Sequence, residues 1–141
     1  MKVKDIMTKQ IACVSADEPI ERAAQLMKQY NVGSIPVCEG EKVIGIVTDR
    51  DIALRLVAQG QGYGVSSVSN IMTPNPVVGS PDMDAGEAAR LMGQRQIRRL
   101  PIVERGTLVG IVALGDISTQ PALQDNAESA LHDISLPGSL T

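Results

Sequence analysis

The feature that most constrains this chain is an internal repeat. The motif Ile-Met-Thr occupies residues 6–8 and recurs at residues 71–73, a shift of 65 positions. The same shift, without a gap, carries Gly-Ile-Val from residues 45–47 to residues 110–112. Further identities fall in the same register, and chance does not maintain one register over about fifty positions. The chain therefore consists of two copies of one structural unit.

The repeat divides the 141 residues into four segments. A glycine-rich stretch separates the two copies, which is typical of a flexible linker. The residues after the second copy carry acidic but no basic side chains. We therefore expect a first repeat at residues 1–59, a linker at 60–67, a second repeat at 68–118, and an acidic C-terminal helix and tail at 119–141.

Each copy predicts the element order strand, helix, strand, strand, helix. The first helix of each copy is expected to begin near an aspartate, Asp17 or Asp82, whose carboxylate would cap free N–H groups. Two β-rich runs then form a hairpin, and the second helix of the first copy runs from Thr48 to about Gln59, ending at Gly60. The expected hairpin strands are residues 34–38 and 42–48 in the first copy, and residues 99–104 and 107–113 in the second.

A unit of about 55 residues buries too little apolar surface to be stable alone. We therefore expect the two β-α-β-β-α repeats to pack together with pseudo-twofold symmetry, in the α/β (α+β) class, with an added C-terminal helix. The apolar stripe of that helix is expected to dock either on the two-repeat module or on a second subunit. The stripe consists of Leu123, Ala127, Ala130, Leu131 and Ile134.

Composition limits the classes of partner. The 13 basic and 16 acidic residues give a net charge of −3, and the pI is near 5.1, which argues against nucleic-acid binding. With no Phe or Trp, aromatic stacking platforms for single strands are excluded. The N-terminus lacks an apolar signal segment, and the apolar stretch at residues 106–115 is far shorter than the roughly 20 residues that span a bilayer. We expect a soluble cytoplasmic protein without a membrane partner.

The sequence contains no recognisable catalytic or metal-binding pattern. Its one histidine, His132, falls on the polar side of the expected C-terminal helix. Two cysteines without Cys-x-x-Cys spacing give no zinc cluster. Neither a Gly-x-Ser-x-Gly nucleophile motif nor a phosphate-binding Walker loop occurs. The prediction is a protein that is not an enzyme and has neither a catalytic cofactor nor a metal.

One segment, residues 45–51, has the chemistry of a binding site. A strand ends there and a helix begins, so free N–H groups and the positive end of the helix dipole favour an anion. Thr48 adds a hydroxyl, Arg50 a cation, and Asp51 a carboxylate that can accept two hydrogen bonds from a vicinal diol such as ribose. Alternatively, Thr48 and Asp51 form only a helix N-cap with its favourable first-turn acid. The residues alone leave both interpretations open.

The repeated motifs resemble those of a tandem CBS-domain pair, the Bateman module. The resemblance covers residues 3–118 and rests on Asp-Ile-Met-Thr at 5–8, Gly-Ser-Ile-Pro-Val at 33–37, and the segments 45–51 and 110–116. Several such motifs in one tandem register are highly specific. The acidic tail helix further resembles small stand-alone bacterial CBS-pair proteins, which implies a homodimer with a protein target that the sequence does not identify.

The resemblance implies two clefts between the repeats, where family members bind adenosine-containing ligands: AMP, ADP, ATP or S-adenosylmethionine. Carried onto this chain, Asp51 would hold the ribose diol and Thr48 would lie beside the phosphate, with Arg50 as an added cation. The other repeat would bracket the adenine and supply cations for the phosphates. These residues are Pro76, Val77, Leu100 and Pro101 at the adenine, and Arg98 and Arg99 at the phosphates.

The second copy departs from the family pattern. Ala113 replaces the threonine, and only Asp116 of the polar residues remains. Because each hydrogen bond from a charged donor to a phosphate contributes about 1.5–3 kcal/mol, we expect the primary nucleotide site at Asp51 and a weak or empty one at Asp116. The cleft at Asp116 would contain no arginine and would be completed by Ile11, Ala12, Ser34, Ile35 and Pro36.

The two cysteines allow two interpretations. Cys13 and Cys38 each lie beside a valine in short expected strands that could be neighbours. A disulfide would form if their Cα atoms came within about 7 Å. Two buried free thiols are the more common outcome in a reducing cytoplasm.

These observations predict a non-enzymatic regulatory module that binds an adenosine nucleotide and signals energy or metabolite state. One alternative is a structural scaffold with unoccupied clefts. The other is a sensor of S-adenosylmethionine, which would argue against the phosphate-binding role of Arg98 and Arg99, because that ligand carries no phosphate.

Overall fold

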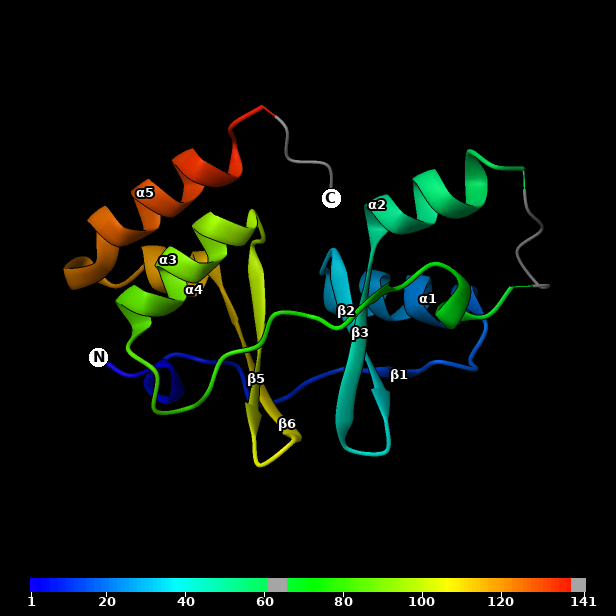
Figure 1. The fold of residues 1–141 in the computed structure, drawn as a ribbon, viewed down its shortest axis with the longest axis horizontal. Helices are drawn as coiled ribbons and strands as arrows, with labels where there is room; N and C mark the ends of the chain where they lie inside the picture. Colours follow the sequence, from blue (N-terminus) through cyan, green and yellow to red (C-terminus); the bar gives the residue numbers. More distant parts are fainter. Residues whose placement is uncertain (61–65, 138–141) are drawn as a thin grey trace. The chain divides into compact units, whose positions relative to one another are not determined.

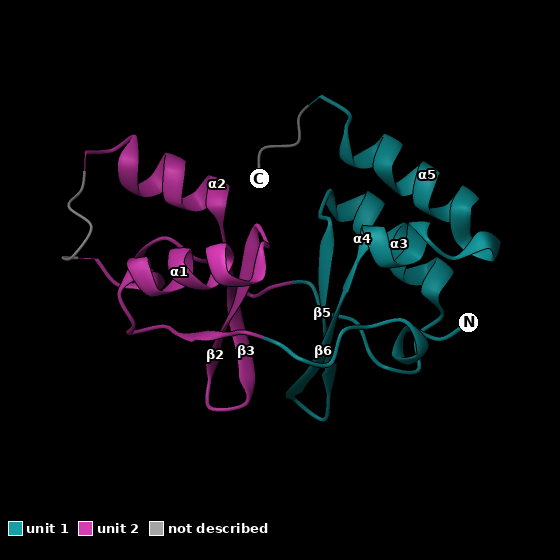
Figure 2. Ribbon diagram, turned by 180° about the vertical axis from the view of Figure 1, so that it is seen from behind, with its two compact units in different colours: residues 1–11, 77–141 teal, residues 12–76 magenta. Residues whose placement is uncertain are grey.

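The computed structural model describes residues 1–60 and 66–137, which form two compact units. Unit 2 is one continuous segment, residues 12–76, whereas unit 1 combines residues 1–11 with residues 77–141 (Figure 2). The compact units and the sequence repeats therefore divide the chain differently. The leading residues of each repeat belong to the unit that is built mainly from the other repeat.

Unit 2 contains a four-stranded sheet in the order β1-β2-β3-β4 (Figure 1). β1 (Val14–Ser15) runs parallel to β2 (Ser34–Glu39), which forms the predicted antiparallel hairpin with β3 (Lys42–Thr48). β4 (Thr73–Pro74) pairs antiparallel with β3 on its other side. The hairpin prediction for the first copy is confirmed.

Two helices complete unit 2. α1 (Ile20–Tyr30) buries one apolar face, and α2 (Asp49–Ile52) continues into a π-helical segment (Ala53–Val57) that ends before Gly60, as predicted. α1 begins later than predicted, because residues 16–18 form a turn and a bend before the N-cap residue, Pro19, whose backbone is extended. The expectation that Asp17 caps this helix is therefore wrong. Of the predicted linker, residues 61–65 lie outside the described part of the chain.

Unit 1 follows the same plan with a smaller sheet. β5 (Arg99–Glu104) and β6 (Thr107–Ala113) form the predicted hairpin, with α3 (Ala85–Arg95) before it and α4 (Leu114–Ser118) after it. Single bridges take the place of the outer strands: Gly79 pairs with Ile102 in parallel, and Thr8 pairs with Ile111 in antiparallel. The β-α-β-β-α plan predicted for each copy is confirmed.

The N-terminus of α3 is capped by Asp84, not by Asp82 as the sequence suggested. Its Oδ2 accepts hydrogen bonds from the backbone N–H groups of Gly86 at 3.0 Å and Glu87 at 3.3 Å. The Asp82 carboxylate is instead paired with Lys4, whose Nζ lies 3.2 Å away. The hydrogen bond and charge of Lys4, together with those of Lys2, hold the pKa of Asp82 below its usual value. Asp82 thus helps to anchor the N-terminal segment to the rest of unit 1.

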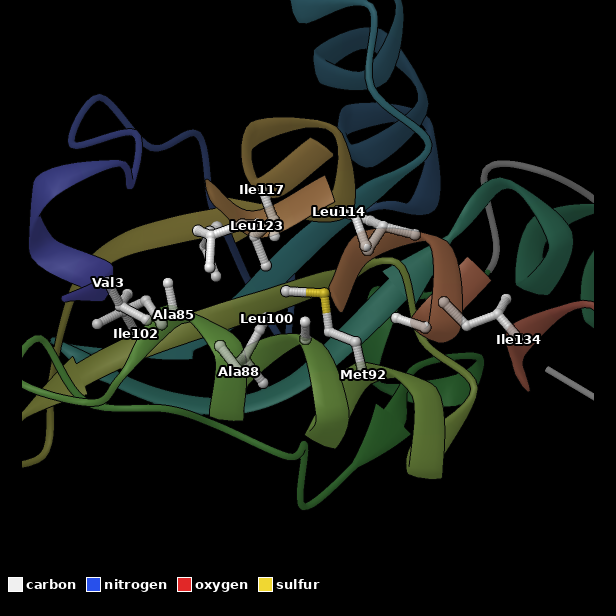
Figure 3. Close-up of a cluster of buried hydrophobic side chains, with 14 residues drawn as sticks. Val3, Ala85, Ala88, Met92, Leu100, Ile102, Leu114, Ile117, Leu123 and Ile134 are labelled. Atoms are coloured by element: carbon white, nitrogen blue, oxygen red, sulfur yellow. The ribbon is translucent and has the colours of Figure 1, made fainter. Parts of the chain in front are cut away.

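The predicted C-terminal helix covers the helices of unit 1. After a 3₁₀ turn (Pro121–Leu123), α5 (Gln124–Ile134) packs on α3 and α4, and Figure 3 shows Met92 and Ile134 among the buried side chains of the resulting core. Leu131 is 44% exposed and does not belong to the buried stripe, contrary to prediction. The other predicted stripe residues are buried: Leu123, Ala127, Ala130 and Ile134. The sequence left open whether the tail docks on the two-repeat module or on a second subunit. In the structure it docks on α3 and α4 of its own chain.

The two motifs that define the repeat contact each other in both units. A methyl carbon built on Gly110 would lie 2.5 Å from the Sδ of Met7, and one built on Gly45 would lie 2.6 Å from the Sδ of Met72. The absence of a side chain at each glycine therefore makes room for a methionine from the other sequence copy. This packing explains why Ile-Met-Thr and Gly-Ile-Val are repeated together.

Candidate functional site

The β3–α2 junction carries the two polar residues that the sequence singles out. The backbone N–H of Thr48 donates to Asp51 Oδ2 at 2.9 Å, and the backbone N–H of Asp51 donates to Thr48 Oγ1 at 3.0 Å. These reciprocal bonds form a capping box at the start of α2. The capping role is confirmed, and it also holds the Asp51 carboxylate in one orientation.

Asp51 is unusual in its burial. Among the residues that the structure describes, it is the one buried charged side chain, with 7% of the residue exposed. Because Oδ2 is taken by Thr48, the second oxygen, Oδ1, is the one available to other donors. Arg55 Nε lies 3.7 Å from this oxygen. A carboxylate with one fixed and one approachable oxygen can accept hydrogen bonds from hydroxyl groups.

Arg55 is the residue at this site that the sequence interpretation missed. Its Nη1 donates to the backbone carbonyl of Ile71 at 3.2 Å, while Nε faces Asp51. An acid followed by a base four residues later on one helix face is a recognised pairing signal, and Asp51 and Arg55 have that spacing. The spacing could have revealed the ion pair, but not the contact with Ile71.

Unit 2 also contains several other residues that the sequence analysis assigned to one or the other of the two ligand clefts. Ser34 is the sheet partner of Thr48, so it lies beside the capping box, although it was assigned to the cleft at Asp116. Arg50 is exposed, and its backbone N–H donates to Asp49 Oδ1 at 2.8 Å. The others in this unit are Ala12 and Pro76, both half-buried, and Ile35 and Pro36, both buried in β2.

Unit 1 has a corresponding but poorer junction. Asp116 Oδ2 accepts a hydrogen bond from the backbone N–H of Ala113 at 2.8 Å, and Ala113 has no hydroxyl to return it. Arg99 is the sheet partner of Ala113, and the carbonyl of Arg98 accepts from the N–H of Leu114 at 2.8 Å. Leu100 and Pro101 are buried in β5, and Ile11 and Val77 are half-buried.

Within one unit, then, the structure places Arg99 at the start of β5, beside the Asp116 junction, and Arg98 directly before that strand. The predicted combination of these arginines with Asp51 joins residues of different units. That combination stays a prediction, to be tested by substitution.

Cys13 and Cys38 are neighbours in unit 2. The adjoining residues Val14 and Val37 are partners in the parallel β1–β2 pair, which confirms that the two short strands are adjacent. Both thiols are free, and Cys13 is exposed, so the expectation of two buried thiols is wrong for Cys13. Burial of Cys38, reinforced by the nearby Cys13 thiol, raises the pKa of Cys38 to about 12. A disulfide between them stays a prediction.

Other features of the described residues do not point to a second site. No group of three His, Cys, Asp or Glu side chains within residues 1–60 and 66–137 could hold a metal ion. No helix in the same ranges is long and apolar enough to cross a membrane. Unit 1 has a hollow of about 390 Å³ that contains none of the predicted site residues. It is lined by Lys4, Asp5, Met7, Lys9, Pro81, Asp82, Glu104 and Val109.

The fold and the repeated junctions define a protein of two β-α-β-β-α domains in tandem. The CBS-domain family matches residues 3–58 and 68–121. The chain therefore belongs to the CBS-domain family, as the motifs predicted, and forms a CBS-pair regulatory module. It is 53% identical over 133 residues to the CBS domain-containing protein YhcV of Bacillus subtilis (strain 168), covering 94% of both chains.

Solved structures show the same fold. A putative signal-transduction protein with CBS domains from Burkholderia ambifaria MC40-6 is 28% identical, with a TM-score of 0.79, over 88% of this chain and 96% of the other. The CBS domain pair of protein MJ0100 is 31% identical, with a TM-score of 0.75, over 84% of this chain and 93% of the other. That second structure is a complex with 5′-methylthioadenosine and S-adenosyl-L-methionine.

Proposed function

We propose that this CBS pair binds an adenosine nucleotide, AMP, ADP or ATP, and that Asp51 holds the ribose of the ligand. The observation that carries the proposal is the arrangement of the Asp51 carboxylate. It is buried, oriented by Thr48 and left with Oδ1 as an acceptor. A preoriented acceptor avoids part of the ordering cost of binding, and a vicinal diol presents two hydroxyl donors to it.

The similarity to MJ0100 supports adenosine as the recognised moiety. Both ligands in that complex contain an adenosine group. The choice of a nucleotide rests on charge, because Arg50, Arg98 and Arg99 would favour a phosphate over a neutral substituent.

S-adenosylmethionine or the thioether nucleoside 5′-methylthioadenosine is the second candidate, and the MJ0100 complex is the specific observation that favours it. These ligands share the ribose with AMP but carry no phosphate. They would use Asp51 in the same way and would be insensitive to substitution of Arg98 or Arg99. A scaffold without ligand is the third outcome.

Isothermal titration calorimetry with AMP, ADP, ATP, S-adenosylmethionine and 5′-methylthioadenosine distinguishes these functions. We expect a nucleotide to bind and Asp51→Asn to weaken binding at least about tenfold, because the amide keeps the cap but loses the charge. Asp116→Asn is the matched control and should matter less. The reverse ranking would contradict the asymmetry, and no binding below about 1 mM of any ligand would indicate a scaffold.

The proposed regulatory role has a physical basis in the two-unit architecture. A ligand that binds one arrangement of the chain more tightly than another shifts the population toward it, and so changes the surface offered to a protein target. The protein would act in the cytoplasm, without catalysis, as a homodimer. Light scattering of the purified protein tests the homodimer: the expected mass is twice 14.9 kDa.

A further inference from the structure

The Arg55 side chain connects the candidate carboxylate to a distant stretch of backbone. Its Nε lies 3.7 Å from Asp51 Oδ1, and its Nη1 donates to the carbonyls of Ile71 at 3.2 Å and Met72 at 3.5 Å. One guanidinium carries several donors in a fixed plane, so it can contact both groups at once. The contacts involve residues 16 and 17 positions further along the chain.

The carbonyls that Arg55 contacts belong to the residues that lead into strand β4. Ile71 and Met72 directly precede β4, which pairs with β3 at Gly45 and Ile46. The Met72 side chain also fills the space above Gly45. A few residues later the chain leaves unit 2, whose last residue is Pro76. Arg55 therefore ties Asp51 to the segment 71–76, through which unit 2 continues into the rest of the protein.

Arg55 also lies beside the oxygen that a ligand would need, at ion-pair distance and without a hydrogen bond to it. Oδ2 of Asp51 is held by the Thr48 N–H, which leaves Oδ1 for the ribose hydroxyls. The Asp51 side chain is 9% exposed, so few directions of approach remain, and Arg55 takes one of them. A hydroxyl that donates to Oδ1 must share this oxygen with the guanidinium or displace it.

We infer that Arg55 is a positioning residue that couples ligand binding at Asp51 to the segment 71–76. Without ligand, Arg55 pairs with Oδ1 and restrains the Ile71 and Met72 carbonyls. A ribose diol that donates to Oδ1 competes with this ion pair and loosens the segment. The inference rests on the proposed adenosine site, but the restraint exists without any ligand.

The other repeat lacks this connection. The residue 65 positions after Arg55 is Gln120, which carries no charge. Among the described residues, Asp116 has no ion pair corresponding to that of Asp51. The coupling therefore belongs to one junction, and Arg55→Gln introduces the uncharged residue that the other repeat has at this position.

The test combines hydrogen–deuterium exchange of the full chain with calorimetry, using AMP and 5′-methylthioadenosine as probes. Arg55→Gln should speed amide exchange in residues 68–76 without ligand. The ligand should speed that exchange in the natural protein but not in the variant. Because a competitor is removed, the variant should bind the ligand about two- to fivefold more tightly. Arg22→Gln, an equal charge change on α1 of the same unit, should change neither quantity.

Each other outcome is decisive. Unchanged exchange at residues 68–76 in Arg55→Gln would overturn the restraint, whatever binds. Weaker ligand binding in the variant would make Arg55 a ligand contact and overturn the competition. If the natural protein binds neither probe, and ADP, ATP and S-adenosylmethionine also fail to bind in the calorimetry described above, the proposed function fails and the competition fails with it. The exchange of the ligand-free variant still decides separately whether Arg55 restrains the segment.

Discussion

Helices α1 and α3 occupy equivalent positions in the two repeats, yet α5 covers α3 and the corresponding face of α1 is exposed. The inner faces are alike, since Ala23 and Met27 of α1 and their counterparts in α3 are buried. The outer faces differ. On α3 the residues toward α5 are Gly86, Ala89 and Gly93, whereas the matching positions of α1 hold Glu21, Ala24 and Lys28. Small residues allow helices to approach closely, so the outer face determines where the tail docks.

At the strand–helix junctions it is unit 2, and not unit 1, that has the additional contacts. Unit 2 has the complete capping box of Thr48 and Asp51 and the Arg55 ion pair. Unit 1 has alanine in place of the threonine and glutamine in place of the arginine. Duplication has thus produced one unit with a larger apolar core and one unit with a more elaborate polar site.

The largest expected loss of stability comes from placing a bulky side chain between α3 and α5. A Cβ on Gly93 would lie 3.3 Å from the Cα of Ala130, which is backbone and cannot move alone. Gly93→Leu should therefore lower the free energy of unfolding by about 2–3 kcal/mol, despite the better helix propensity of leucine. Chemical denaturation measures this change. Lys28→Leu, the same residue at the matching exposed position of α1, should change stability by about 0.5 kcal/mol or less. Equal losses in both variants would contradict the comparison.

A smaller effect is expected where the two units are alike. Gly110→Ala places a methyl 2.5 Å from Met7 Sδ, and Gly45→Ala places one 2.6 Å from Met72 Sδ and 3.0 Å from the Thr73 carbonyl. Each should cost about 1–2 kcal/mol in thermal or chemical unfolding, because the methionine must move.

The control for these glycines is Gly115→Ala. A Cβ there meets no atom within 4 Å, and the position is helical, so the variant should be neutral or slightly more stable. A loss at Gly115 as large as that at Gly110 would show that the methionine contacts are not the cause.

The smallest effect concerns the caps of the first helices. Asp84→Ala removes the acceptor for the N–H groups of Gly86 and Glu87 and should lower stability by about 1 kcal/mol. Asp17→Ala, at the position where the sequence suggested a cap in unit 2, should have almost no effect, because Pro19 begins that helix without a side-chain bond. Urea unfolding of the two variants side by side checks the difference. A loss in Asp17→Ala equal to that in Asp84→Ala would restore the sequence-based prediction.

Much of the local structure was predictable because it depends on local patterns. Runs of β-forming residues separated by short connections located both hairpins, and β5 and β6 have the predicted bounds. The predicted start of α3 was two residues too early, because an aspartate at position 82 or 84 can cap a helix. In the folded protein Lys2 and Lys4 pair with Asp82, and Asp84 caps the helix. Thr48 and Asp51 were found from their spacing, whereas the contact of Arg55 with Ile71 depends on chain segments that no local pattern brings together.

By itself, the sequence determined that the chain is a duplicated β-α-β-β-α unit with a tail helix, because periodicity and a constant register are properties of the linear order of residues. The tertiary structure decided which copy supplies the outermost strand of each sheet. Thr8 pairs with Ile111 and Thr73 with Ile46, so each sheet is completed by a segment from the other copy. The reason is that the two copies of each motif are nearly identical. Local preference does not distinguish pairing within a copy from pairing between copies, and only the packed fold selects one of them.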